Sequence, residues 1–272
     1  DDLGVVHLRL SAYWNEIEPT DDGYNFEILD WQINEAKKRN AEIILAIGQK
    51  TPRWPECHIP EWANALPEKE RKEKLFEILQ VLVERYEDED SIWAWQVENE
   101  PLFPFGICPP IDQELFEREV RFVKSLDATR PIITTDSGEM SLWIESGSQG
   151  DIFGTTLYKV VIGSGIGMFN YDFLPPVFYR KKAEILKRLL PNLEDIIIVE
   201  LQAEPWTAGI PVSPDTLDEQ FRRFSLERFT NHIKYAQDVG YSKTYLWGVE
   251  WWYWLKEEAG HPEFWEEAKT LF

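Results

Sequence analysis

The stretch that decides the fold runs Ile92-Trp93-Ala94-Trp95-Gln96-Val97-Glu98-Asn99-Glu100-Pro101, a short apolar segment that ends abruptly in acidic residues and a proline. Side chains alternate between the two faces of a β-strand. If Glu100 points to one face, the small or polar residues share it: Ala94, Gln96 and Glu98. The bulky apolar residues then take the opposite face: Trp93, Trp95 and Val97. Active sites of (β/α) barrels lie at the carboxyl ends of the strands, so this pattern predicts a barrel strand that ends in a functional acid.

Short apolar runs alternate with longer amphipathic, charge-rich segments along the whole sequence, which is typical of repeated β-then-α units and a parallel sheet. The apolar runs predict seven strands, over Val5–Leu10, Glu42–Ile47, Ile92–Val97, Ile132–Thr135, Asp151–Tyr158, Ile196–Val199 and Thr244–Val249. The helical patterns cover Leu29–Arg39, Pro67–Glu87, Gln113–Leu126, Tyr179–Leu190, Leu217–Val239 and Pro262–Leu271. The sequence therefore predicts an α/β fold of the TIM type, a (β/α)8 barrel.

A barrel of this type normally has about eight strands, and seven are readable here. The opening Asp1-Asp2-Leu3-Gly4 is typical of the last turn and glycine stop of a helix, so we expect the first βα unit to be absent. Loss of that unit from this chain and closure by seven strands plus a substitute both fit the sequence. Because no linker or change of composition divides residues 1–272, we expect a single catalytic barrel domain. The one Gly-rich stretch, Gly163–Gly167, is expected to be a mobile loop.

The charge balance excludes several classes of partner. Forty-nine acidic residues against 28 basic ones give a formal net charge of −21, which repels phosphate backbones and anionic membrane surfaces. Nucleic acid and membrane are therefore not expected partners. The sequence has no apolar window of the roughly 18 residues that a membrane span needs, and no basic-then-apolar leader. We expect a soluble chain without a targeting signal, whose compartment and oligomeric state the sequence leaves open.

Cysteine and histidine are scarce. Two cysteines and four histidines form no metal-spaced cluster, so neither a metal nor another cofactor is expected. Cys57 and Cys108 follow adjacent predicted strands, and both a disulfide and two free thiols fit that placement. The 13 tryptophans fit two roles, core packing and stacking on sugar rings.

A second apolar run also ends in a carboxylate. It is Ile196-Ile197-Ile198-Val199-Glu200-Leu201-Gln202-Ala203-Glu204-Pro205-Trp206. Glycoside hydrolysis needs two carboxyl groups, one protonated to assist the leaving oxygen and one ionised to attack or to activate water. Glu100 and Glu200 satisfy that demand, and Glu200 is preferred to Glu204 because it ends the apolar run directly. The alternative for each acid is a structural role, such as capping a helix or pairing with an arginine.

Other side chains are predicted to face the same rim. Arg9 lies on the inward face of the first strand, where a cation keeps one carboxylate ionised while the other carboxyl group has its pKa raised. Tyr158 ends its strand where its hydroxyl could bond a carboxylate, and core packing is the alternative. If the last strand continues through residue 252, Glu250 and Trp252 face inward, and Trp251 replaces Trp252 if a bulge shifts the register.

With these residues in place, the chain resembles the clan A glycoside hydrolases, barrel enzymes that include many cellulases, β-galactosidases and β-glucosidases. The most specific match is the Asn99-Glu100 pair at the end of the clan's fourth strand. Supporting matches are Leu8-Arg9-Leu10-Ser11, Tyr13-Trp14-Asn15-Glu16-Ile17-Glu18-Pro19, the acid Glu200 at the seventh strand, Tyr158, and a tryptophan after the last strand. The resemblance covers nearly the whole chain.

The resemblance implies a role for each matched residue. Glu100 would be the general acid/base, Asn99 would hold the sugar 2-hydroxyl, and Glu200 would be the nucleophile of a retaining hydrolase of β-glycosides. It also implies carboxyl groups about 5 to 5.5 Å apart. The expected substrate-binding residues are Arg9, Asn99, Tyr158, Trp206, Trp252, Glu204 and Trp54.

The sequence does not choose among glucose, galactose, mannose and xylose. Aromatic residues of predicted loops fit a sugar cleft, namely Trp54, Phe103, Trp143 and Trp206. A non-catalytic carbohydrate-binding barrel is the first alternative, in which the acids serve only as hydrogen-bond acceptors. A metal-dependent hydrolase on the same fold is the second, and it is disfavoured because His7 is the only histidine in a predicted strand.

Overall fold

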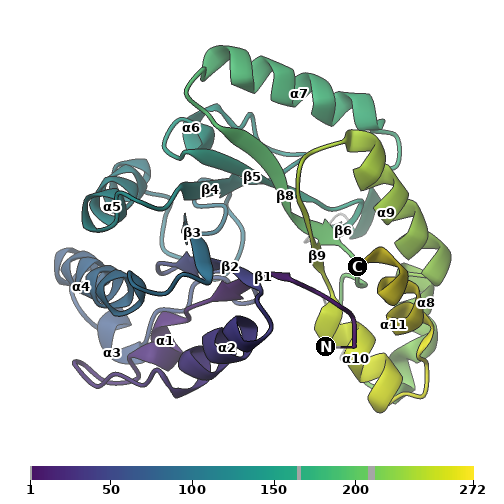
Figure 1. Cartoon of the computed structure of the whole chain (residues 1–272), viewed down its shortest axis with the longest axis horizontal. Coiled ribbons are helices and arrows are strands. Elements are labelled where there is room, and N and C mark those ends of the chain that lie inside the picture. Colours follow the sequence, from purple (N-terminus) through teal and green to yellow (C-terminus); the bar gives the residue numbers. More distant parts are fainter. Residues whose placement is uncertain (1, 164–166, 208–211) are drawn as a thin grey trace.

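The computed structural model describes residues 2–163, 167–207 and 212–272, and its strands form a ring surrounded by helices (Figure 1). Seven parallel strands pair in the order β1-β2-β3-β4-β5-β8-β9. The sheet curves into a nearly closed barrel that lacks one βα unit of the TIM type, and β1 and β9 are its edges. The predicted α/β class and barrel architecture are confirmed.

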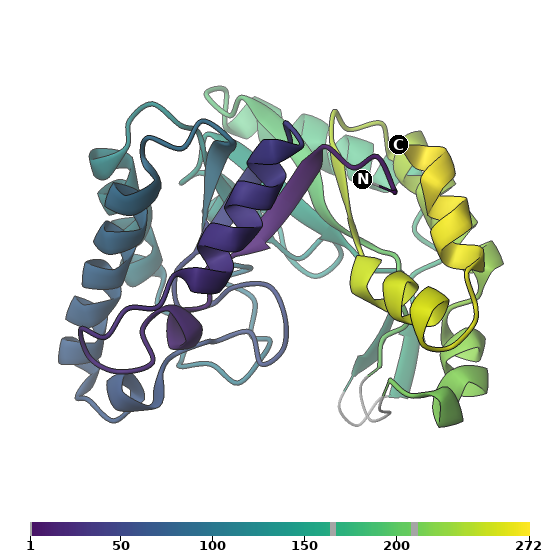
Figure 2. The same cartoon turned by 60° about the horizontal axis from the view of Figure 1, so that its bottom comes forward.

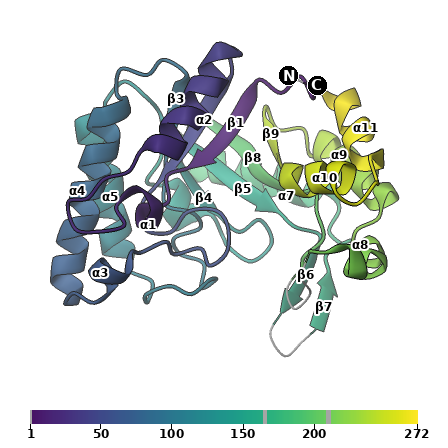
Figure 3. The ribbon, with the colours of Figure 1, turned by 90° about the horizontal axis from the view of Figure 1, so that it is seen from below.

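The strands of the main sheet match the seven predicted runs within a few residues. They are β1 (His7–Ser11), β2 (Glu42–Ile47), β3 (Ile92–Val97), β4 (Ile132–Asp136), β5 (Ile152–Leu157), β8 (Asp195–Gln202) and β9 (Thr244–Trp247). A separate antiparallel hairpin consists of β6 (Val160–Gly163) and β7 (Gly167–Asn170). Figure 3 shows this hairpin projecting beyond the barrel. The predicted mobile loop is thus flanked by paired strands, and its residues 164–166 lie outside the described residues.

The longer helices lie where the amphipathic patterns predict them: α2 (Glu27–Lys38), α4 (Glu68–Tyr86), α5 (Gln113–Leu126), α7 (Pro176–Leu189), α9 (Leu226–Val239) and α11 (Glu263–Ala268). Short helical segments in the connections are α1 (Trp14–Ile17), α3 (Glu61–Asn64), α6 (Ile144–Gly147), η1 (Pro214–Thr216) and η2 (Lys269–Leu271).

Two helices differ from the prediction. The single helix expected over 217–239 is divided into α8 (Leu217–Arg223) and α9, because Phe224 is extended and the Ser225 side chain caps α9 by accepting from Arg228 N–H. Residues expected to finish the last strand form helix α10 (Val249–Glu257) instead. The strand stops because Gly248 turns the chain at φ 146°.

The core has an inner and an outer part. A small cluster fills the barrel interior: Ile44, Ala94, Ile133, Ile152, Ile197, Val199 and Tyr245. Larger clusters lie between the outward strand faces and the helices, and one of them buries Trp95 against Leu79 and Val120. The expected parity of β3 is thus confirmed for Ala94 and Trp95. No helix of the described ranges is long and apolar enough to cross a membrane.

The N-terminal residues pack against the C-terminal helices, and Figure 2 shows the two ends of the chain close together. Leu3 belongs to the cluster that holds Phe264 and Trp265 of α11. The Trp265 indole N–H donates to Asp2 Oδ2 at 2.7 Å, and Lys269 Nζ lies 2.9 Å from Asp2 Oδ1. These contacts tie together the two sides of the open seam between β9 and β1.

The barrel interior is tightest at Gly154 of β5. A Cβ atom at this position would lie 2.5 Å from Val199 Cγ1 and 3.1 Å from Thr135 Cγ2. We predict that Gly154→Ala lowers the free energy of unfolding by about 1 to 3 kcal/mol through overpacking. Denaturant titration measures the change. Removing the Val199 methyl groups should make room for the new Cβ atom, so Gly154→Ala should cost less free energy of unfolding in a Val199→Ala background than in the wild type. Equal costs in the two backgrounds would contradict overpacking as the cause.

Candidate active site

Arg9 of β1 lies at the centre of the rim formed by the carboxyl ends of the strands. Its Nε donates to Gln96 Oε1 at 2.7 Å, and its two terminal nitrogens donate to Asn99 Oδ1 at 2.8 Å and Glu200 Oε1 at 2.5 Å. The Arg9 side chain is only 5% exposed. The inward direction predicted for Arg9 is therefore what the structure shows, and one cation joins the ends of three strands.

A bulge in β8 turns Glu200 toward the rim. Ile197 and Val199 both face the barrel interior, so strict alternation would turn Glu200 outward. Thr155 pairs with Ile198 and Thr156 pairs with Glu200, which leaves Val199 as the extra residue of the bulge. Glu200 therefore also faces inward, where its Oε2 accepts from the Tyr158 hydroxyl at 3.0 Å.

Glu100 is held by neighbours on β4 and β5 and by Lys50 in the loop after β2. Its Oε1 accepts from Thr156 Oγ1 at 2.9 Å, and its backbone N–H donates to Thr135 Oγ1 at 2.8 Å. Lys50 Nζ donates to the Glu100 carbonyl at 2.8 Å. Burial, and next the negative charge of Glu200, raises the pKa of Glu100 to about 8. Glu100 is therefore a carboxyl group that keeps its proton at neutral pH.

Glu98 leaves the rim despite its predicted parity. Strand β3 ends at Val97, and Glu98 and Glu100 have positive φ angles of 59° and 44°, so the pleat does not continue. The Glu98 carboxylate accepts from the backbone N–H groups of Gln49 at 2.8 Å and Lys50 at 2.6 Å. It lines a cavity of about 290 Å³ beneath the rim together with Glu119. The expectation that Glu98 faces the mouth is wrong.

Asn99 bridges Arg9 and a residue that the sequence analysis missed. Asn99 Oδ1 accepts from Arg9, and its Nδ2 donates to Glu56 Oε2 at 3.2 Å. Glu56 is buried in the loop after β2. Side chains in loops follow no periodicity, so a periodic pattern could not identify Glu56. The neighbouring Cys57 was the one local feature that pointed to this loop.

Glu204 lies near the pair but has different partners. Its Oε1 accepts from the Trp247 indole N–H at 3.0 Å. Burial, and next the negative charge of Glu250, raises the pKa of Glu204 to about 7. Arg9 and Tyr158, in contrast, both bond Glu200.

Trp54 and Trp206 belong to an aromatic group that extends to Tyr158, the residue whose hydroxyl bonds Glu200. The Trp206 ring centroid lies 5.6 Å from that of Tyr158 and 5.6 Å from that of Phe105. Trp54 lies 6.1 Å from Phe105 on the outer side and is 62% exposed. This aromatic group offers apolar ring faces near Tyr158.

The expectations for Trp252, Trp251 and Trp143 are wrong. Trp252 lies on helix α10, is 1% exposed, and donates its indole N–H to the Ala203 carbonyl at 2.7 Å. Trp251 is also buried and donates to Gln220 Oε1 at 2.7 Å, and Trp143 is fully buried in the core. Their ring faces are covered by protein, so they offer a sugar no surface.

Trp247 takes the place at the rim that Trp252 was expected to take. It ends β9, its indole N–H bonds Glu204, and the Arg53 guanidinium lies 5.5 Å from the centre of its ring. Arg53 also donates to Glu250 Oε1 at 2.8 Å. Alternation with Glu250 and Trp252 facing inward puts Trp247 on the opposite face of the strand, so the sequence did not indicate Trp247.

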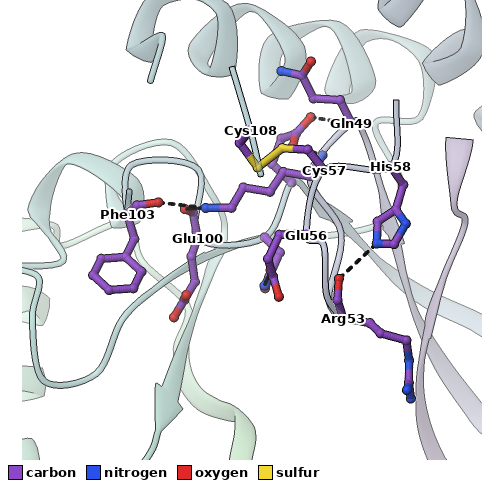
Figure 4. Close-up of a disulfide and its surroundings, with 11 residues drawn as sticks. Gln49, Arg53, Glu56, Cys57, His58, Glu100, Phe103 and Cys108 are labelled. Atoms are coloured by element: carbon purple, nitrogen blue, oxygen red, sulfur yellow. Dashed lines mark hydrogen bonds between the residues drawn. A yellow bond between two sulfur atoms is a disulfide. The ribbon is translucent and has the colours of Figure 1, made fainter. Parts of the chain in front are cut away.

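Cys57 and Cys108 form a disulfide (Figure 4). It joins the loop after β2, which carries Glu56, to the loop after β3, which carries Phe103 and Phe105. Of the alternatives left open by the sequence, the structure shows the bonded form.

A group of acids away from the pair is close enough to share a cation. Among the described residues, the carboxylates of Glu18, Asp21 and Asp22 lie within 4.8 Å of one another. Glu18 is already bonded to the Trp14 indole N–H at 2.8 Å. These acids lie in the turn after α1 and do not contact Glu100 or Glu200.

A barrel of parallel strands with two opposed acids at its carboxyl rim is the architecture of the clan A glycoside hydrolases. The chain belongs to glycosyl hydrolase family 5, whose cellulase family model matches residues 1–142, just over half of its length. The resemblance to clan A that the sequence indicated is confirmed.

Relatives and solved structures agree with this class. The β-galactosidase BgaA of Clostridium cellulovorans is 27% identical over 119 residues, which cover 36% of this chain and 18% of that protein. The β-galactosidase of Rahnella sp. R3 superimposes with a TM-score of 0.64 and 12% identity, covering 99% of this chain and 51% of that one. A GH5_18 protein of Bifidobacterium longum, solved in complex with Manβ1-4GlcNAc, superimposes with a TM-score of 0.54 and 13% identity, covering 84% of this chain and 58% of that one. The chain thus spans only part of each of these proteins, and the structural likeness shows the fold.

Several buried carboxyl groups make stability depend on pH. Burial, the first cause in each case, raises the pKa values of Glu56, Glu98, Glu139 and Glu204 to about 7 and that of Glu100 to about 8. At a pH above the ordinary carboxyl pKa, the unfolded chain has lost these protons while the folded chain still holds them. The free energy of unfolding therefore decreases as pH rises through the pKa values of the folded chain.

We predict that the free energy of unfolding falls between pH 6.5 and pH 8.5, by roughly 1 kcal/mol for each such group. Three lysines oppose the trend, since burial lowers the pKa of Lys182 to about 8 and also lowers the pKa values of Lys50 and Lys159, but the five carboxyl groups outnumber them. Urea titrations at several pH values measure the slope, and Glu204→Gln should make it shallower. A stability that rises across this interval would contradict the assignment.

Proposed function

We propose that this protein is a retaining glycoside hydrolase that cleaves β-O-glycosidic bonds by double displacement. One observation carries the proposal: the two acids at the rim have opposite environments. Glu200 accepts hydrogen bonds from a buried arginine and a tyrosine hydroxyl, which stabilise its ionised form. Glu100 is buried next to that negative charge and keeps its proton to a pKa of about 8. A nucleophile and an acid at one site are what the reaction requires.

In the first step a Glu200 carboxylate oxygen attacks the anomeric carbon and forms an ester bond. The bond between that carbon and the glycosidic oxygen breaks, and the oxygen takes the proton of Glu100 as it leaves. Arg9 and Tyr158 hold the Glu200 carboxylate in position during the attack. Asn99, whose amide is fixed by Arg9 and Glu56, holds the sugar 2-hydroxyl.

In the second step the roles of Glu100 reverse. Ester formation removes the charge on Glu200, so the pKa of Glu100 falls and its carboxylate can accept a proton from water. The water oxygen attacks the anomeric carbon, the ester bond breaks, and Glu200 leaves as a carboxylate. Two inversions give net retention of configuration, and Glu100 regains the proton that it donated.

Glu204 is the less suitable nucleophile. Its carboxyl group bonds Trp247 and has a raised pKa, so it is partly protonated at neutral pH. We propose that Glu204 and Trp247 line the sugar pocket, with Trp54 and Trp206 toward the leaving group. The matched relative is a β-galactosidase, so β-galactosides are the first substrates to test.

Alanine variants of the two acids, assayed with activated aryl β-glycosides, assign the roles. Without azide, Glu200→Ala should lose at least about 10⁴-fold in kcat, because no covalent intermediate forms. Azide should restore turnover and yield the α-glycosyl azide. Glu100→Ala should hydrolyse the ester slowly, and azide should yield the β-glycosyl azide. Product configuration is read by proton NMR.

Glu204→Ala is the matched control, since this acid lies at the same rim. It should keep the wild-type nucleophile and give no glycosyl azide. If azide rescues Glu204→Ala rather than Glu200→Ala, the assignment of the nucleophile is wrong. If the wild type cleaves no β-glycoside but still binds sugars, the protein is a carbohydrate-binding barrel.

A further inference from the structure

Glu56 is a third carboxyl group beside the two acids, and neither step of the mechanism uses it. Figure 4 shows its side chain pointing in the same direction as that of Glu100, away from the disulfide. It is buried, and its Oε2 accepts from Asn99 Nδ2 at 3.2 Å. Burial, followed by the negative charge of Glu200, raises its pKa to about 7. Asn99, which also accepts from Arg9, therefore links Glu56 to the residues around Glu200.

The backbone around Glu56 is held in an uncommon conformation. Its φ angle is 75° and that of Arg53 is 105°, both in the left-handed region that few side chains adopt. The Glu56 carbonyl accepts from Thr51 N–H at 2.9 Å and its own N–H donates to the Arg53 carbonyl at 2.7 Å. Strain of this kind persists where surrounding structure enforces it, and it gathers at functional sites.

Two further contacts fix the loop. Cys57, the next residue, is bonded to Cys108 in the loop after β3. Gly106 of that loop packs so closely that a Cβ atom there would lie 2.6 Å from the Glu56 Cβ. A glycine is therefore required opposite Glu56, and the carboxyl group is presented to the pocket by two loops tied together.

We propose that Glu56 is a substrate-binding residue that accepts a hydrogen bond from the sugar hydroxyl next to the one that Asn99 holds. The inference rests on the proposed function, in which Asn99 takes the 2-hydroxyl. Because neighbouring hydroxyls of a pyranose ring lie side by side, a 2-hydroxyl on Asn99 brings the 3-hydroxyl to Glu56. Its Oε2 fixes the Asn99 amide, and its Oε1 is the oxygen that the 3-hydroxyl would reach.

The geometry also indicates the class of sugar. The carboxyl groups of Glu56, Glu100, Glu200 and Glu204 lie near one another, and the buried Arg9 is already engaged with Gln96, Asn99 and Glu200. A sugar with a free equatorial 3-hydroxyl and no negative charge fits this environment. Glucosides, galactosides, mannosides and xylosides share that hydroxyl, whereas 3-deoxy sugars lack it.

The experiment measures kcat/KM for 4-nitrophenyl β-D-galactoside or β-D-glucoside, whichever the wild type cleaves faster, and for its 3-deoxy and 2-deoxy analogues. The wild type should lose roughly 10- to 100-fold on the 3-deoxy substrate, because the buried Glu56 acceptor is then left without its donor. Glu56→Ala should lower kcat/KM for the parent substrate by a similar factor relative to the wild type. For the 3-deoxy substrate, its kcat/KM should be little lower than that of the wild type. Glu56→Gln keeps a hydrogen-bond acceptor, so its kcat/KM for the parent substrate should lie between those of the wild type and Glu56→Ala.

Glu18→Gln is the matched control, because Glu18 is also buried with a pKa raised by burial but lies outside the pocket. It should keep the wild-type ratio between parent and 3-deoxy substrates. A purely structural role for Glu56 would lower activity on all three substrates equally, and that result would overturn the proposal. Thermal unfolding of each variant separates lost folding from lost binding.

A binding measurement keeps this test independent of catalysis. Calorimetric titration with the phenyl 1-thio-β-glycoside and its 3-deoxy analogue compares wild type with Glu56→Ala. If the wild type prefers the parent sugar and the variant does not, the proposal holds even if no glycoside is cleaved. An unchanged preference in the variant would overturn it, while absent turnover alone would contradict only the proposed hydrolase activity.

Discussion

The buried guanidinium of Arg9 is the interaction on which the site depends. It bonds Gln96 and Asn99 from β3 and its connecting loop, and Glu200 from β8, residues 87 to 191 positions away in the chain. A charge removed from water is stable only when its hydrogen bonds are satisfied and opposite charge is close. The barrel meets that demand by bringing the carboxyl ends of distant parallel strands to one rim. The same contact places a positive charge against Glu200, while burial and the charge of Glu200 raise the pKa of the neighbouring Glu100.

Keeping several acids close together is electrostatically unfavourable in a chain with a net charge of −21. Several carboxyl groups lie near one another, and they remain compatible because their pKa values are raised to about 7 or 8, so that they are partly or mostly protonated at neutral pH. Lys50 offsets part of the negative charge from beneath, where its Nζ donates to the carbonyls of Glu100 and Phe103. The disulfide and the tight approach of Gly106 then hold the rim loops in place. Left-handed backbone conformations and buried carboxyl groups are thus concentrated at the carboxyl ends of the strands, while the barrel interior is packed mainly with aliphatic side chains.

Periodicity was enough to predict what regular structure controls. Apolar runs located all seven strands of the main sheet, and alternation predicted that Arg9 and Gln96 face inward. Prediction failed where the chain departs from regular geometry. Positive φ angles turn Glu98 under the rim, Gly248 starts a helix that buries Trp252, and a loop without periodicity carries Glu56. Glu200 was identified because it ends an apolar run, although its direction depends on a bulge at Val199 that the sequence does not reveal. The side chains of the candidate site therefore lie both on predictable strands and on connections that only tertiary contacts define.

In the mechanism proposed above, Glu100 and Glu200 act in two successive displacements at one carbon. Proton NMR of the wild-type reaction on an aryl β-glycoside, recorded before the released sugar mutarotates, tests this sequence of steps. We expect the β-anomer to appear first and the α-anomer to grow in later at the spontaneous rate. Initial release of the α-anomer would show a single displacement by water, and it would contradict the roles assigned to both carboxyl groups.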